Sequence, residues 1–162
     1  MNKGEFMLRY IGDSKNIRNR VRQHCKGNVE SSALRKTIAR EMGLDVRAEK
    51  RLSGSSKYTI HPLSGEEMVS SYIQSGTWKV ISCQTAEDAR DFQWYAIDNL
   101  RPMLNKYMQF WNKNSEGDYQ ELLDEMLRSN SMVYTSISTF PTQPGVYSLW
   151  HDSTPVDFAK KT

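Results

Sequence analysis

Cysteine is scarce in this sequence, and long apolar runs are missing. Cys25 and Cys83 are its only two cysteines, which excludes a disulfide-stabilised scaffold and a zinc site with four cysteine ligands. No run approaches the roughly 18 apolar residues that span a bilayer, and the mean hydropathy is −0.70. The first ten residues, MNKGEFMLRY, lack the apolar stretch of a secretory signal. We therefore expect a cytoplasmic protein that has no membrane partner.

Charge is unevenly distributed along the 162 residues. Residues 1–57 contain 14 Lys and Arg against 6 Asp and Glu, whereas residues 58–162 contain 8 against 13. A front half this basic creates a local field that favours polyanions. A solvated basic helix face is the simpler interpretation. A nucleic-acid partner is the functional one, because Arg and Lys make most contacts to phosphates.

The spacing of apolar residues predicts alternating strands and helices. We expect strands at 5–11, 77–83, 132–138 and 146–150, and helices at 15–26, 31–43, 64–75, 85–100 and 117–129. Asp13 or Ser14 is the expected cap of the first helix, and Thr85 with Asp88 resembles a capping box. Residues 45–57 are polar and basic, which predicts a loop, and the last dozen residues show no periodic signal. Such elements favour a small α/β or α+β domain with helices against a central sheet.

Two blocks of the sequence resemble the GIY-YIG nuclease superfamily. Tyr10-Ile11-Gly12 ends the first predicted strand, Arg20 follows Tyr10 by ten residues, and His24 follows Arg20 by four. This spacing is similar to the second half of the family signature.

The second block runs from Gln93 to Asn105 and is similar to the family's third motif. That motif has an acidic residue followed by an apolar residue at +4, proline at +9 and asparagine at +12. Ile97, Pro102 and Asn105 match the three later positions. The resemblance implies a mainly antiparallel sheet in an α+β fold.

The first half of the signature lies at the wrong end of the chain. Pro144-Gly145-Val146-Tyr147 resembles the GIY strand but follows YIG by more than a hundred residues instead of preceding it. A circular permutation, a truncated second copy, or a strand exchanged with another chain in a homodimer would each account for this order. We favour permutation within a single domain over residues 1–162. Its segments are residues 1–106 from the YIG strand through the third motif, a helical connector at 107–139, the GVY strand at 140–151 and a tail at 152–162.

The resemblance implies roles in phosphodiester hydrolysis for five residues. Tyr147 would act as the general base or orient the water, although a phenol with a pKa near roughly 10 needs help from a neighbour. Tyr10 would hydrogen-bond to the water or phosphate, and Arg20 would bind the phosphate through its planar guanidinium group. His24 could relay a proton or bond to the tyrosine hydroxyl. Asn105 would order the site.

Position 93 departs from the family. The family places the glutamate that binds Mg²⁺ or Mn²⁺ there, whereas this sequence has Gln93. The amide keeps the shape but loses the negative charge that a hard cation favours. On a helix, Asp91 and Asp98 point away from Gln93, so the sequence predicts a nuclease site whose metal ligand is neutralised.

Basic residues surround the proposed site and would supply sequence-independent affinity for DNA. They are Lys15, Arg18, Arg22, Arg35, Lys36, Arg47, Lys50, Arg51 and Lys57. The segment 45–57 could enter a groove of the DNA or form a disordered surface loop.

Three functions fit these observations. The first is a DNA endonuclease with one divalent metal, impaired by Gln93. The second is a non-catalytic DNA-binding module that keeps the nuclease fold. The third is an RNA-directed nuclease, since the charge pattern does not distinguish DNA from RNA.

Overall fold

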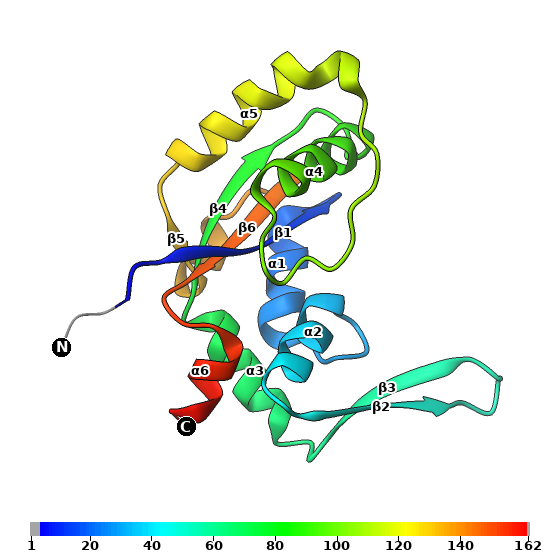
Figure 1. Ribbon diagram of the computed structural model, residues 1–162. Coiled ribbons are helices and arrows are strands. Elements are labelled where there is room, and N and C mark those ends of the chain that lie inside the picture. Colours follow the sequence, from blue (N-terminus) through cyan, green and yellow to red (C-terminus); the bar gives the residue numbers. More distant parts are fainter. Residues whose placement is uncertain (1–3, 162) are drawn as a thin grey trace.

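A four-stranded antiparallel sheet with helices on both faces forms the body of the computed structural model, which describes residues 4–161 (Figure 1). The strand order is β1-β6-β4-β5. Its strands are β1 (Met7–Ser14), β4 (Thr77–Ser82), β5 (Met132–Val133) and β6 (Gly145–His151). A separate hairpin consists of β2 (Asp45–Lys50) and β3 (Ser56–His61). This is the predicted α+β architecture with a mainly antiparallel sheet.

Two apolar cores lie on opposite faces of the sheet because successive strand residues point to opposite sides. Ile11 and Val146 pack with α4 and α5, whereas Tyr147 and Leu149 pack with α1, α2 and α3. The helices are α1 (Ile17–Lys26), α2 (Ala33–Glu41), α3 (Gly65–Gln74), α4 (Ala86–Leu100), α5 (Glu116–Arg128) and α6 (Pro155–Lys160), with short 3₁₀ turns η1 (Lys113–Ser115) and η2 (Tyr134–Thr139).

Strand β6 pairs with β1 within the same chain. The two strands are antiparallel, with Gly12 opposite Tyr147 and Ile11 opposite Ser148. On its other side β6 pairs with β4. The late GVY strand therefore lies directly beside the early YIG strand.

Side-chain caps fix where the helices that carry the site begin. Ser32 caps α2, and Thr85 caps α4 by accepting a hydrogen bond from the Asp88 amide, as predicted. The cap of α1 is Asn16, not Asp13 or Ser14. That prediction was wrong because β1 continues past Gly12 to Ser14 and takes up both residues.

Three further expectations about secondary structure were wrong. Residues 45–57 form most of the β2–β3 hairpin, not a loop, because Val46 and Ile60 pair across it and pack on the core. Residues 132–138 form only two residues of strand before η2. The tail contains α6, which begins after a Thr154 cap. Its signal was too short to appear as a period.

Among residues 4–161, no helix is both long and apolar enough to cross a membrane.

Candidate active site

Three buried side chains from different elements form a hydrogen-bonded row. His24 on α1 lies with Nε2 2.7 Å from the Tyr147 hydroxyl on β6 and with Nδ1 2.7 Å from Ser32 Oγ at the start of α2. All three are essentially inaccessible to solvent. With Nδ1–H donating to Ser32, Nε2 accepts the phenolic hydrogen; the other tautomer reverses both bonds. The imidazole is thus held at both nitrogens and joins a phenol to a hydroxyl.

Burial keeps both titratable members of this row uncharged at neutral pH. It lowers the pKa of His24 well below its usual range, and the charges of Arg20 and Arg35 lower it further. Burial also raises the pKa of Tyr147 well above its usual range, an effect that Tyr10 reinforces and Arg20 opposes. Tyr147 is therefore a neutral phenol at rest, with a neutral imidazole placed to take its proton.

Tyr10 lies beside this row at the edge of the sheet. Its ring centroid is 6.1 Å from that of His24 and 6.4 Å from that of Tyr147. Gly12 allows the close approach, since a Cβ at this position would collide with the Tyr147 ring and hydroxyl. The glycine of the YIG motif is thus required by the phenol that packs against it.

Arg20 lies one helical turn before His24 on α1, partly exposed. Its guanidinium donates to the Ser31 carbonyl at 3.1 Å and to the side chain of Gln23. Burial raises the pKa of both Tyr10 and Tyr147, and the positive charge of Arg20 opposes both shifts. Arg20 is thus a cation held by the α1–α2 loop and close enough to both phenols to affect their pKa values.

A pocket adjoins this cluster on the side of α4. Tyr10 lines both the cluster and the pocket, whose remaining walls are Ala33, Thr37, Gln93, Trp94, Leu104, Asn105, Lys106 and Tyr107. Gln93 is 7% exposed, and its Oε1 has no hydrogen-bond partner among the described residues. A buried acceptor without a donor costs free energy, so position 93 offers an unused oxygen to the pocket.

The donor set of the pocket does not fit a divalent cation. An amide oxygen can bind Mg²⁺, but the ion favours carboxylates, and no carboxylate lines the pocket. Asp91 accepts a hydrogen bond from the Tyr119 hydroxyl at 2.6 Å, and Asp98 accepts one from Trp111 Nε1 at 3.0 Å, so both point elsewhere as predicted. Within residues 4–161 no group of three or more His, Cys, Asp or Glu side chains could hold a metal ion.

Asn105 acts on the backbone of β1. Its Nδ2 donates to the Ile11 carbonyl and its Oδ1 accepts from the Ile11 amide, both at 2.9 Å. The side-chain amide of Asn105 thus pairs with the edge strand β1 as a neighbouring strand would. This contact holds the loop after α4 against β1. Asn105 therefore holds the backbone of the residue that follows Tyr10, and both side chains line the pocket.

One of the nine predicted DNA-binding residues does not lie on the surface. Arg35 is buried, donates to the His24 carbonyl at 2.8 Å and forms an ion pair with Glu66 at 2.9 Å. Its inclusion was wrong, because it braces α1 against α3 inside the body and cannot reach a phosphate.

The other eight remain at least partly exposed. Arg18 donates to the Phe140 carbonyl, and Lys36 lies 3.5 Å from the centre of the Tyr58 ring. Arg47 and Arg51 are ion-paired with Asp45 and Glu30. Lys15, Arg22, Lys50 and Lys57 have no ion pair among the described residues.

Sequence reasoning missed three residues of the site. Either Ser31 or Ser32 was expected to start α2, but the contact of Ser32 with His24 needs the packing of α2 on α1. Asp13 was taken for a cap, although its charge acts on both site tyrosines. Tyr107 lines the pocket and is 82% exposed. An aromatic residue two positions after the Asn105 motif was the one available signal.

A comparison with known families decides what this arrangement belongs to. The model of the GIY-YIG catalytic domain matches residues 2–129. The chain belongs to this family. The GIY-YIG match includes Tyr10, Arg20, His24, Gln93 and Asn105 and ends before β6, so Tyr147 lies outside it. No curated protein and no solved structure matches the chain.

Proposed function

We propose that this GIY-YIG domain is a DNA endonuclease that works with one divalent ion, Mg²⁺ or Mn²⁺, and that it is impaired by glutamine at position 93. The observation that carries the proposal is the buried Tyr147–His24–Ser32 row, with Arg20 beside it and Gln93 in the adjoining pocket. The family is of the nuclease type. DNA as the substrate follows from that family and from the basic residues around the site.

The residues of the chain can divide the work of hydrolysis. The reaction needs an activated water and neutralised charge on the phosphate. Because burial disfavours a free tyrosinate, Tyr147 takes a proton from the water in the same step in which it passes its own to the neutral His24. Arg20 binds the phosphate, and Tyr10 donates a hydrogen bond to the water or phosphate. A divalent ion would supply Lewis-acid chemistry at position 93, but the present donor set does not fit one.

A non-catalytic DNA-binding module is the second candidate. The unpartnered, uncharged Gln93 favours it, because it removes the one charge that metal binding requires. The intact Tyr10, Arg20, His24 and Tyr147 favour the enzyme.

The chain order is proposed to reflect circular permutation of one domain. Support comes from the antiparallel pairing of β6 with β1 in one chain and from a family match that ends before β6. A cytoplasmic location and a homodimeric or strand-exchanged assembly stay predictions.

A plasmid-nicking assay with Mg²⁺ or Mn²⁺ tests the proposal. It compares the native chain, Gln93→Glu and the double variant Gln93→Glu/Arg20→Ala. Gln84→Glu is the matched control, because it adds the same charge at an exposed position outside the pocket. We expect only Gln93→Glu to cleave strongly and the added Arg20→Ala to abolish cleavage. If Gln93→Glu stays inactive while both chains bind DNA with a steep salt dependence, the binding module is the right function.

A further inference from the structure

We propose that the β2–β3 hairpin enters a groove of duplex DNA beside the active site, with Leu52 at its tip inserted between base pairs. This inference rests on the proposed function, since it assumes that the chain binds DNA. Four features of the hairpin carry it: its shape, the charge of its tip, the side chain at its apex and its anchorage.

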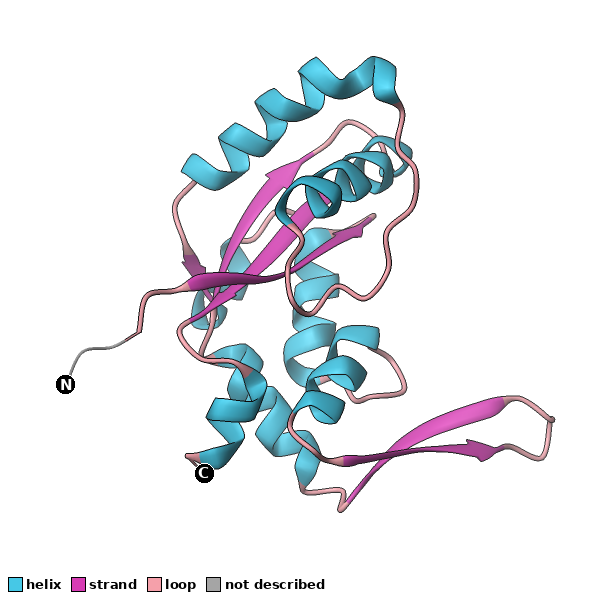
Figure 2. Ribbon diagram, in the orientation of Figure 1, coloured by secondary structure: helices cyan, strands magenta, loops and turns pink. Residues whose placement is uncertain are grey.

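The hairpin projects from the body of the molecule (Figure 2). Val46 and Ile60 at its root pack on the core, whereas residues 47–57 are exposed. Six residues per strand extend about 20 Å at roughly 3.3 Å per residue. Two-stranded ribbons of this kind bind DNA in the major or the minor groove.

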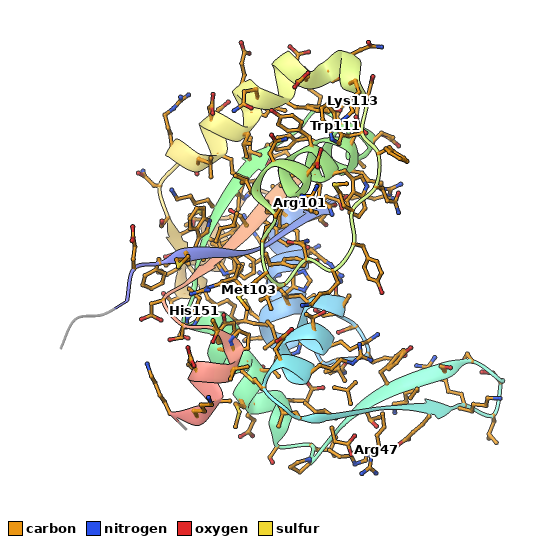
Figure 3. The ribbon with its side chains drawn as sticks, viewed as in Figure 1. Arg47, Arg101, Met103, Trp111, Lys113 and His151 are labelled. Carbon is orange, nitrogen blue, oxygen red and sulfur yellow. The ribbon has the colours of Figure 1, made fainter. Side chains whose placement is uncertain are left out.

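Charge becomes more positive towards the tip. Residues 50–57, KRLSGSSK, include three cationic side chains and no acidic one. Asp45 at the root pairs with Arg47 at 2.7 Å, and Glu49, opposite Lys57, has its carboxylate 3.5 Å from His61 on the root side (Arg47 is labelled in Figure 3). Arg51 forms an ion pair with Glu30. Lys50 and Lys57 are therefore the side chains available for phosphates.

Leu52 is the one apolar side chain in residues 49–57, and it is fully exposed. The turn that carries it is closed by the Arg51 amide donating to Ser55 O at 2.8 Å, with Gly54 in the left-handed region at a φ of +90°. Ser53 is small and Gly54 has no side chain, so neither covers Leu52. Leucine is one of the wedges that proteins insert between base steps, where burial repays the cost of unstacking.

The hairpin is anchored next to the catalytic arginine. Glu30 accepts hydrogen bonds from the Tyr58 amide of β3 and from Arg51. The next residue, Ser31, holds Arg20 through its carbonyl. The loop between α1 and α2 thus holds both the hairpin and Arg20. A duplex that binds the hairpin would therefore have its phosphate backbone near Arg20.

The test measures binding and bending of a short duplex that is labelled at both ends for energy transfer and contains 2-aminopurine. The full-length chain is compared with Leu52→Ala and with Leu63→Ala, a control that removes another exposed leucine, at the root of the hairpin. We expect Leu52→Ala to weaken duplex binding about tenfold or more, as expected for losing burial of a leucine. It should also abolish bending and the 2-aminopurine signal, whereas Leu63→Ala behaves as the native chain.

A second pair of variants tests the groove contact. Lys50→Ala and Lys57→Ala should each reduce the salt slope of binding by about one phosphate contact. The inference is overturned if Leu52→Ala binds and bends the duplex like the native chain, or if single strands bind as tightly as duplex. Those results leave the nuclease proposal standing, because Gln93→Glu can still cleave. Failure of the native chain to bind any DNA would remove both.

Discussion

Side chains of the Tyr147–His24–Ser32 row are buried and held by hydrogen bonds from three elements, whereas those of the β2–β3 hairpin beyond its root face solvent on both sides. The same residue type therefore has different consequences in the two regions. Arg35 is fully buried beneath the row, and the side chain of Arg47 on the hairpin is 57% exposed, yet each forms one ion pair with a carboxylate. The body fixes geometry through packing, whereas Lys50 and Lys57 of the hairpin are exposed and have no ion pair among the described residues.

The largest effect is expected from removing one oxygen atom in the row. Tyr147→Phe, made in the Gln93→Glu background, should lower the cleavage rate by about 10²- to 10⁴-fold, the usual contribution of a positioned acid or base. The ring stays, so the fold is retained. Rates come from single-turnover nicking. Tyr134→Phe, a half-buried tyrosine outside the row, is the control, and equal rates for both variants would contradict the role of Tyr147.

The two ion pairs should differ sharply in stability. Arg35→Ala leaves the buried end of Glu66 and two backbone carbonyls without their donor. It should cost about 3–5 kcal/mol in the free energy of unfolding. Arg47→Ala should cost less than about 1 kcal/mol, because exposed pairs contribute little. Urea denaturation measures both, and similar losses would show that the hairpin is as tightly integrated as the body.

Acid should destabilise the body through His24. Because the pKa of His24 is lowered in the folded state, the unfolded chain binds the extra proton. Stability is then fully present above the unfolded pKa of about 6.5 and falls as pH drops below it, by up to about 1.4 kcal/mol per pH unit. Denaturation curves at several pH values should show this slope in the native chain and a shallower one in His24→Gln. His151, whose pKa is also lowered, contributes equally to both chains, so identical slopes would refute the assignment to His24.

The smallest effect concerns Ser32. Both Ser32→Ala and Thr85→Ala remove a helix cap and should cost about 1 kcal/mol each. Only Ser32→Ala also releases His24 Nδ1. In the Gln93→Glu background it should lower cleavage and shift the pH–rate profile, and Thr85→Ala should do neither. Matching profiles for the two variants would limit Ser32 to capping.

Local sequence was sufficient where a feature depends on neighbours along the chain. The spacing of Tyr10, Arg20 and His24 places the two α1 residues one helical turn apart. Thr85 caps α4 through an amide three residues away. Gln93 could be identified as the changed position because the third motif is contiguous. The periodicity of apolar residues predicted a domain of helices against a central sheet, and the resemblance to the family narrowed it to the α+β class.

Tertiary structure decided everything that depends on partners distant in sequence. The polar segment 45–57 has weak strand propensity, and it forms a hairpin because its root packs on the core and Glu30 binds the Tyr58 amide. Arg35 is buried because Glu66 and the end of α1 offer acceptors for its donors. Asn105 bonds to Ile11, 94 residues away. Composition and spacing do not predict these long-range contacts, because residues far apart in sequence meet only when the helices pack on the two faces of the sheet.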